Sequence, residues 1–393
     1  MPADWPTKTL GEVLRLEYGA SLPEHVRTNG PVTVYGSAGP IGFHDQPLVA
    51  GPGIVVGRKG SIGRVTWAPS DFFPIDTTYY VMPVDGMLNL RWAFHLLDYE
   101  DLLHLNRATG VPGLNRADVH ALRRPIPPLG EQGDIAEVLD AVDSAIDETK
   151  LVINATEALR TALLQELLTN GAHGRRRAQK STELGSLPAH WEVVRLREIT
   201  KSIIYGPRFP ADKYAKEGNV ATLRTTDISD DGHIALDAMP LANLDLKSFQ
   251  HCLLAAGDLV ITRSGSCGIT AVFRGFHLPV LPGAFLLRLR MRADVQSEFL
   301  ELWLNSPMGR RATTRLQAGG VQKNLNAANL AELLVPLPPR EERELICDIF
   351  GRLHALLTSQ RHALDCLQLS KARLASELLT GRVQVKVRTG IPA

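Results

Sequence analysis

Two short glycine turns carry the side chains in this sequence that are best suited to hold an anion or the edge of a base. The first reads Arg58-Lys59-Gly60-Ser61-Ile62-Gly63, and the second reads Arg263-Ser264-Gly265-Ser266-Cys267-Gly268. Glycine lets the backbone approach a ligand closely, and a cation beside a hydroxyl suits a phosphate or a base edge. A plain hairpin turn with a solvated arginine is the alternative. The candidate DNA contacts in the turns are Arg58, Lys59, Ser61, Arg263, Ser264 and Ser266.

A second polar cluster follows each turn, at residues 109–115 and 319–326. Asparagine, glutamine and lysine side chains there can make paired hydrogen bonds with bases or phosphates. For Asn115 and Asn326 an equal alternative is the capping of a short helix that begins at Ala117 or Ala327. The remaining DNA-contact candidates are Thr77, Thr78, Asn115, Arg224, Gln322, Lys323 and Asn324.

The sequence offers no recognisable machinery for catalysis. Neither turn continues as the Gly-Lys-Ser/Thr of a P-loop, and no Gly-x-Gly-x-x-Gly follows an expected strand. There is no Asn/Asp-Pro-Pro-aromatic tetrad, and no convincing carboxylate and lysine constellation of a nuclease. The four cysteines lack zinc spacing, so reduced thiols are expected. We therefore expect no catalytic residue, no metal site and no cofactor in this chain.

Composition is that of an ordinary globular protein, with 393 residues and a net charge of +1. A balanced charge neither requires nor excludes a polyanionic partner, because basic patches can be segregated from acidic ones. No apolar run approaches the roughly 18 residues that span a bilayer, and the amino terminus does not resemble a signal peptide. A cytoplasmic location and no membrane contact are expected.

The chain repeats itself. Pro125-Ile126-Pro127-Pro128 is answered by Pro336-Leu337-Pro338-Pro339, a shift of 211 residues (336 − 125). The same shift holds where Glu166-Leu167-Leu168-Thr169 is answered by Glu377-Leu378-Leu379-Thr380 (377 − 166). Because this segment tolerates no insertion over forty residues, it is expected to be a rigid element.

Length varies only before the rigid segment. Trp5 and Trp191 open the two copies with a shift of 186 (191 − 5), and the glycine turns are shifted by 205 (263 − 58). The second copy has therefore gained 19 residues (205 − 186) before its turn and 6 (211 − 205) after it. Short β-like runs, Gly and Pro turns and one amphipathic stretch in each copy indicate a mixed α/β domain.

After each proline run, apolar residues recur in steps of three, four and seven, the pattern of a coiled-coil seam. Each helix should run for about 40 residues, or about 60 Å. We predict that the two helices pair antiparallel, because one apolar seam cannot be buried by an isolated helix. The predicted seam residues are Ile135, Val138, Val142, Leu159, Leu163, Ile346, Ile349, Leu353, Leu356, Leu367 and Leu374.

The predicted fold is α/β (α+β), with two pseudo-repeated globular DNA-recognition domains separated by two long antiparallel helices in a pseudo-twofold circular arrangement. The predicted limits are 1–128 for the first recognition domain, 129–170 for the first helix, 171–190 for a linker, 191–339 for the second domain, 340–381 for the second helix and 382–393 for a tail.

The order Trp-x4-Leu-x-Glu, Arg-x-Gly-Ser-x-Gly, Gly-Val with Leu-Asn, Pro-x-Pro-Pro and a helix ending Glu-Leu-Leu-Thr, occurring twice, resembles the specificity subunit of type I restriction-modification enzymes. The segments Val56–Gly63 and Pro74–Tyr80 are similar to that family's first-domain pattern. One departure is that Glu131-Gln132 becomes Glu342-Arg343 in the second copy.

The resemblance implies a non-catalytic reader of double-stranded DNA, with two target recognition domains that each read half of a bipartite site. The helices would set a spacer near 10 base pairs. They would also dock two adenine-methyltransferase subunits that use S-adenosylmethionine, and restriction/translocase subunits that use ATP and Mg would join them. Two other classes remain open: a DNA-binding subunit with catalytic activity of its own, and a coiled-coil protein scaffold.

Overall fold

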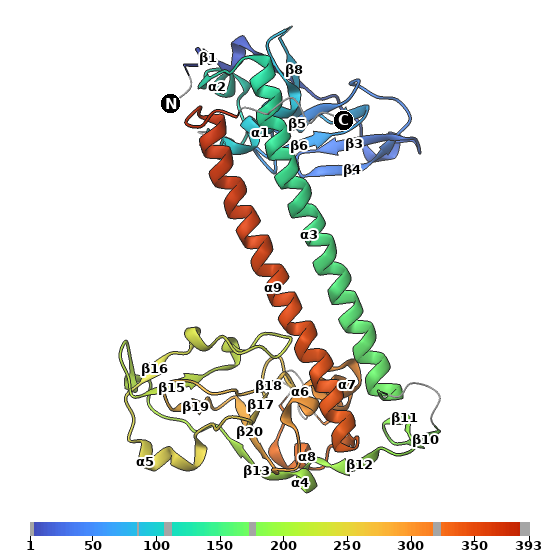
Figure 1. The fold of residues 1–393 in the computed structure, drawn as a ribbon, viewed down its shortest axis with the longest axis vertical. Coiled ribbons are helices and arrows are strands. Elements are labelled where there is room, and N and C mark those ends of the chain that lie inside the picture. The colour runs from blue at the N-terminus through green and yellow to red at the C-terminus, as the bar shows by residue number, and fades with distance from the viewer. Residues whose placement is uncertain (1–3, 85, 106–111, 173–177, 317–323, 386–393) are drawn as a thin grey trace, which may run out of the picture. The chain divides into compact units, whose positions relative to one another are not determined.

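The computed structural model describes residues 4–84, 86–105, 112–172, 178–316 and 324–385. The chain divides into two compact units, Met1–Ile153 with Ser359–Ala393 and Asn154–Thr358. Both units contain β-sheets and helices, which confirms the predicted mixed α/β class (Figure 1). None of the helices in the described ranges is long and apolar enough to cross a membrane.

The first unit is built on a four-stranded antiparallel sheet in the order β2-β8-β5-β6, with a three-stranded sheet β4-β3-β7 and a small pair β1-β9. Its short helices are α1 and α2, and it holds the start of α3 and the end of α9. The bounds are β1 Thr7–Thr9, β2 Leu14–Tyr18, β3 Val32–Gly36, β4 Gly39–His44, β5 Gly53–Gly57, β6 Val65–Ala68, β7 Phe72–Pro74, β8 Thr78–Pro83, α1 Leu90–Tyr99, α2 Arg116–His120, β9 Arg123–Pro125 and α3 Leu129–Asn170.

The second unit repeats this plan with the sheets β13-β20-β17-β18, β14-β16-β15-β19 and β12-β21, and adds a hairpin β10-β11. The bounds are β10 Gln179–Thr182, β11 Gly185–Pro188, β12 Glu192–Arg195, α4 Leu196–Ile199, β13 Thr200–Tyr205, β14 Tyr214–Ala215, β15 Val220–Leu223, β16 Leu241–Ala242, α5 Leu246–Phe249, β17 Leu259–Thr262, β18 Thr270–Val272, β19 Val280–Pro282, β20 Leu286–Met291, α6 Ser297–Asn305, α7 Pro307–Arg315, α8 Ala327–Ala331, β21 Leu334–Leu337 and α9 Arg340–Leu379.

The two units share strand pairing as well as strand order. β3 pairs parallel with β7, and β15 pairs parallel with β19, whereas the large sheets of both units are antiparallel. The 19 residues gained before the second turn accommodate β14 and α5, and the 6 gained after it accommodate α7. Duplication therefore kept the sheet framework and changed the segments around it.

The long helices pack antiparallel within each unit. In the first unit, Leu139 near the start of α3 shares a core with Leu378 near the end of α9. In the second unit, Leu167 near the end of α3 shares a core with Ile346 near the start of α9. Since each unit joins opposite ends of the two helices, the antiparallel prediction is confirmed.

The predicted seam is right at most positions and wrong at two. Ile135 and Ile346 are fully buried, but Leu159 and Leu356 are 51% and 47% exposed, so neither lies in the seam. Ile146, Ile153 and Leu357 are the buried residues that the prediction missed. The other predicted seam residues are partly buried: Val138, Val142, Leu163, Ile349, Leu353, Leu367 and Leu374.

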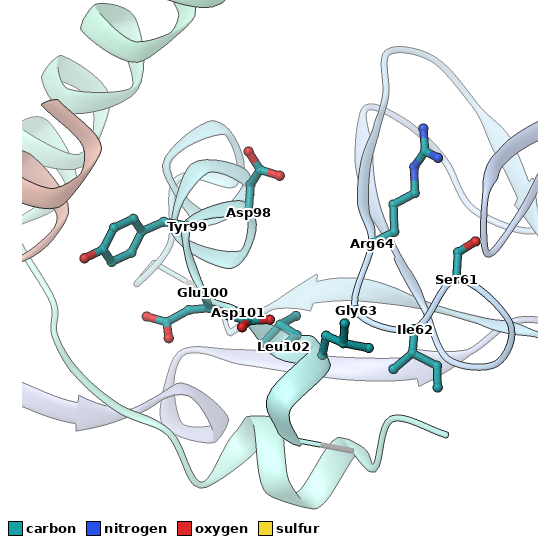
Figure 2. A pocket seen from close by; sticks show the side chains of 10 residues that line it. Ser61, Ile62, Gly63, Arg64, Asp98, Tyr99, Glu100, Asp101 and Leu102 are labelled. Atoms are coloured by element: carbon teal, nitrogen blue, oxygen red, sulfur yellow. The ribbon is translucent and has the colours of Figure 1, made fainter. Parts of the chain in front are cut away.

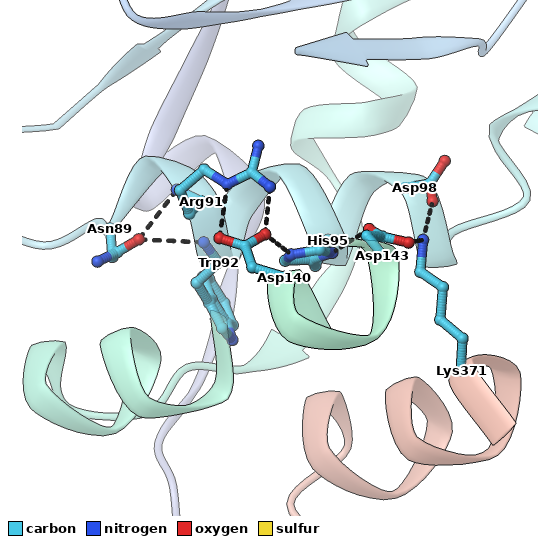
Figure 3. A network of polar contacts seen from close by, with 8 residues as sticks. All are labelled: Asn89, Arg91, Trp92, His95, Asp98, Asp140, Asp143 and Lys371. Carbon is cyan, nitrogen blue, oxygen red and sulfur yellow. Dashed lines mark hydrogen bonds and ion pairs between the residues drawn. The ribbon is translucent and has the colours of Figure 1, made fainter. Parts of the chain in front are cut away.

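In the first unit, buried polar groups attach α1 to both long helices (Figure 3). Arg91 and His95 on α1 both bind the carboxylate of Asp140 on α3, with His95 Nε2 2.7 Å from Oδ1. Lys371 on α9 lies 2.8 Å from Asp143 on α3. Burial lowers the pKa of His95, although the hydrogen bond to Asp140 opposes the shift.

Each repeat also fastens its opening tryptophan to the first turn of a long helix. Trp5 Nε1 donates to Glu131 Oε2 at 2.9 Å, and Trp191 Nε1 donates to Glu342 Oε2 at 3.0 Å. The adjoining Gln-to-Arg change leaves the helix start intact, because Gln132 and Arg343 both donate to backbone carbonyls of the preceding segments.

Candidate nucleic-acid interface

The first glycine turn connects β5 to β6 and is held by backbone hydrogen bonds on both sides. Arg58 N donates to Thr77 O at 2.9 Å, and Leu114 N donates to Arg58 O at 2.9 Å. Gly60 and Gly63 have φ of 77° and 75°, which side-chain-bearing residues rarely adopt. The turn therefore fixes where the Arg58 side chain leaves the backbone.

The turn packs closely on the segment that follows α1. A Cβ at Gly63 would lie 2.9 Å from the Leu102 Cβ. Beside this contact is a hollow of about 410 Å³, with the turn on one wall and acidic side chains, including Asp98 and Asp101, on the other (Figure 2). An acidic wall does not favour a phosphate, so we place the anion-binding face of the turn at Arg58 and Lys59.

The second turn, between β17 and β18, repeats this arrangement. Arg263 N donates to Phe285 O at 3.0 Å, and Leu325 N donates to Arg263 O at 3.0 Å. Gly268 has a φ of 88°, and a Cβ there would lie 2.9 Å from Thr313 Oγ1 on α7. The same backbone device therefore holds an arginine in each unit.

Each of these arginines stacks on an exposed tyrosine at the end of a strand. The guanidinium carbon of Arg58 lies 5.0 Å from the ring centroid of Tyr18, and that of Arg263 lies 4.6 Å from the ring centroid of Tyr205. The tyrosines are 48% and 42% exposed. Such stacking orders a long, flexible side chain at the surface.

The charge of each stacked arginine is not neutralised by a carboxylate. Arg58 Nη1 donates to Asp76 O at 2.9 Å, and Arg263 Nη1 donates to Ala284 O at 3.4 Å. Neither guanidinium forms a salt bridge within the part of the chain that the structure describes. Arg263 Nε is buried without a hydrogen-bond acceptor. Two ordered cations are thus available for an anionic partner.

A buried tyrosine supports the exposed one in the first unit. The rings of Tyr18 and Tyr79 lie 5.0 Å apart, and Tyr79 Oη donates to Leu114 O at 2.9 Å. Burial raises the pKa of Tyr79 to about 12, so its hydroxyl remains a donor at neutral pH. The platform under Arg58 is therefore tied to the core.

The second polar clusters cap helices. Asn115 accepts from Ala117 N at 3.0 Å and Asn326 accepts from Asn329 N at 2.7 Å, as the capping alternative predicts. Asn324 forms an isolated β-bridge with Ser264 and is partly exposed. The predicted contacts Gln322 and Lys323 lie outside the described residues.

The sequence matches the family of the type I restriction modification DNA specificity domain at residues 2–156 and again at 188–364. The two matches together cover most of the chain. The chain belongs to this DNA specificity family.

Named members of the specificity family are similar in sequence. The chain is 24% identical over 286 residues to the type I restriction enzyme MjaVIII specificity subunit of Methanocaldococcus jannaschii, a match that covers 71% of this chain and 66% of that protein. It is 26% identical to the putative MjaX specificity subunit of the same organism, over 71% and 64% of the two chains. It is 23% identical to the EcoBI specificity subunit of Escherichia coli, over 78% and 67%. The match thus spans slightly less than two thirds of the first two relatives.

Solved structures show the same fold. A crystal structure of a type I restriction-modification S subunit from M. genitalium superposes with a TM-score of 0.64 at 18% identity, covering 96% of each chain. A chain from a structural study of type I complex assembly gives 0.59 at 17% identity, covering 98% of this chain and all of that chain.

In this specificity-family chain, most predicted DNA contacts lie at the surface. Thr78 requires a correction: it is completely buried, and its hydroxyl donates to Ile75 O at 2.7 Å within a turn. Arg224 is exposed but is held by the buried Asp227, whose hydrogen bond raises the pKa of Arg224. The other described candidates are exposed or partly exposed: Arg58, Lys59, Ser61, Thr77, Asn115, Arg263, Ser264, Ser266 and Asn324.

Tyr18 and Tyr205 are the site residues that sequence reasoning missed. A signal existed, because their shift of 187 (205 − 18) is close to that of the opening tryptophans. Their closeness to the turns arises only when β2 pairs with β8 and β13 pairs with β20, which place each strand end beside the turn.

We expect Gly63→Ala to lower the free energy of unfolding by about 1–3 kcal/mol. The substitution combines a positive φ with a close approach to Leu102. Gly86→Ala is the matched control, since Gly86 also has a positive φ, of 71°, but a Cβ there meets nothing within 4 Å. Chemical denaturation measures both variants, and equal losses would show that the contact with Leu102 is unimportant.

Proposed function

We propose that this chain is the DNA sequence-specificity subunit of a type I restriction-modification system, each unit reading half of a bipartite, asymmetric DNA site. The observation that carries the proposal is the recurrence, in two copies of a DNA specificity domain, of an exposed arginine stacked on a tyrosine without a carboxylate partner.

Local charge, rather than net charge, supports DNA binding. The whole chain carries only +1, so a long-range field contributes little. Arg58 and Arg263 instead offer guanidinium donors whose geometry suits phosphate oxygens or the edge of guanine. Their order in the free protein reduces the entropy lost on binding.

The differences between the units support two unlike half-sites. Thr77 in the first unit and Phe285 in the second occupy equivalent positions, because the backbone carbonyl of each accepts from the turn arginine. The second unit also carries β14, α5 and α7 around the shared framework. Surfaces with different side chains and insertions present different contacts to a groove.

In this proposal the chain is not itself catalytic. Two adenine-methyltransferase subunits would dock on the long helices and supply S-adenosylmethionine chemistry, and restriction/translocase subunits would add cleavage with ATP and Mg. The assembly would act in the cytoplasm, where it meets genomic DNA. Within the described residues, no group of three or more His, Cys, Asp or Glu side chains is placed to hold a metal ion.

The proposal is tested by mapping methylated adenines in the host genome and then measuring binding to the mapped site. Full-length chain with its modification subunits should prefer a duplex carrying that site over one with both half-sites scrambled. The purified chain alone, given Mg²⁺ or S-adenosylmethionine, should neither cleave nor methylate DNA. Activity of the isolated chain would instead support the catalytic alternative.

Shortening both long helices should shorten the spacer between the half-sites. Removing the equivalent heptads Glu148–Asn154 and Ser359–Asp365 shortens each helix by about 10 Å. At 3.4 Å per base pair the spacer should lose about 3 base pairs, while both half-site sequences stay the same. Methylation mapping in cells that carry the deletion measures the spacer.

A deletion in only one helix is the control, because it offsets the two seams and should lower stability without producing a new defined spacer. Retention of the original spacer by the stable double deletion would contradict the role of the helices as a ruler.

A further inference from the structure

We infer that the arginine and tyrosine pairs, Arg58 with Tyr18 and Arg263 with Tyr205, bind the phosphate backbone of DNA and do not read bases. This inference rests on the proposed function and divides the labour within it. The pairs hold each half-site in place, and the neighbouring side chains that differ between the units discriminate sequence.

The first argument is the sameness of the pairs. The amide and the carbonyl of each arginine make equivalent backbone hydrogen bonds in the two units, with all four distances at 2.9–3.0 Å. The guanidinium in each case donates to the carbonyl one residue before that of Thr77 or Phe285. Unlike half-sites share no base sequence, but they share a backbone, so a contact that is the same in both units fits the backbone.

The second argument is the unmet charge. The stacked guanidinium groups are partly buried, receive no carboxylate within the described residues, and in Arg263 leave Nε without an acceptor. A cation held in this way gains most from an anion with several acceptor oxygens, such as a phosphate. By contrast, Arg224 already has Asp227 as its partner.

The third argument is the contrast beside each pair. Phe285 is 54% exposed, whereas its counterpart Thr77 is a small, partly exposed hydroxyl residue. Apolar side chains contact the thymine methyl group, and threonine can either donate or accept a hydrogen bond. The side chain next to a constant anchor is therefore the one that changes between the units.

The test measures affinity and its salt dependence for the full-length chain with its modification subunits. The probes are duplexes with both mapped half-sites, with the first scrambled, with the second scrambled and with both scrambled. Arg58→Gln and Arg263→Gln keep a donor for the backbone carbonyl but remove the charge. Each should lower affinity for all four duplexes by roughly the same factor, about tenfold, and reduce the slope of log K against log salt by about 1.

Two comparisons separate the explanations. Arg352→Gln removes a charge from an 80% exposed side chain on α9 and should change neither affinity nor slope. Phe285→Thr should alter preference within the second half-site only and leave the salt slope unchanged. Thermal unfolding of each variant establishes that it is folded.

Loss of affinity by Arg263→Gln only on duplexes with an intact second half-site would overturn the inference, since the arginine would then read bases. Unchanged binding by both glutamine variants would overturn it as well. If the wild-type complex itself does not prefer its mapped duplex, the proposed function fails, and that result is distinct from either outcome.

Discussion

Glu342→Ala is expected to lower the free energy of unfolding by about 3–4 kcal/mol, because it strands buried donors at the start of α9. The Glu342 side chain is 3% exposed and accepts from His190 Nε2 at 2.7 Å, Trp191 Nε1 at 3.0 Å and Ala172 N at 2.8 Å. Trp191 is completely buried, so water cannot replace the lost acceptor without disturbing the core. Chemical denaturation followed by tryptophan fluorescence measures the loss.

Glu131→Ala is the matched control in the first unit. Among the described contacts, Glu131 accepts one side-chain hydrogen bond, from Trp5, and the carboxylate is only partly buried. The expected loss is about 1 kcal/mol. Equal losses in the two variants would contradict the idea that the number of buried donors sets the cost.

The effect of Glu342 should also depend on pH. Burial raises the pKa of Glu342, but the hydrogen bonds from His190, Ala172 N and Trp191 lower it overall, below its ordinary 4.5. A carboxyl whose pKa is lower in the folded state contributes stability above its unfolded pKa, and this is lost as pH falls through the folded pKa. The difference between wild type and Glu342→Ala should therefore shrink as the pH falls below about 4.5.

The repeat made the architecture predictable. A register of 211 residues that holds from the proline runs to the end of both helices leaves a rigid rod as the only simple element of that length. The stops were also visible, since Gly171 and Gly381 have φ of 75° and 71° just beyond the last helical residues. Covalent periodicity and glycine chemistry are local, so sequence alone carries them.

The seam register was less predictable, because neighbouring leucines fit it equally well. Leu356 and Leu357 stand three and four residues after Leu353, and both steps occur in a coiled coil. The structure buries Leu357 and leaves Leu356 47% exposed. On α3, the seven-residue step from the buried Ile153 reaches Arg160, so counting apolar residues selected Leu159 instead.

The partners of the glycine turns could not be read from the sequence. Tyr18 lies 40 residues (58 − 18) from Arg58, and Tyr205 lies 58 residues (263 − 205) from Arg263. Each contact depends on strand order in a sheet, which no single motif encodes. The likeness between the two sites is therefore a tertiary property, even though the turns themselves are evident as motifs.

Asp140→Ala is expected to destabilise the first unit by about 2–3 kcal/mol. His95 is 1% exposed at its side chain and would lose its partner at 2.7 Å, whereas Arg91 is 30% exposed and can be hydrated (Figure 3). Burial raises the pKa of Asp140, but the hydrogen bonds from Arg91 and His95 lower it overall, so the carboxylate is ionised at neutral pH. Chemical denaturation measures the loss, and faster hydrogen exchange in α1 locates it.

The second repeat supplies the control, because the position equivalent to Asp140 is Gly351 (140 + 211). A Cβ at Gly351 meets nothing within 4 Å, so Gly351→Ala should stabilise α9 by about 0.8–1 kcal/mol through helix propensity alone. The same propensity acts in favour of Asp140→Ala, which means that any measured loss understates the value of the polar contacts. A stabilised Asp140→Ala variant, with α1 still protected from exchange, would show that the network in Figure 3 contributes nothing to the attachment of α1.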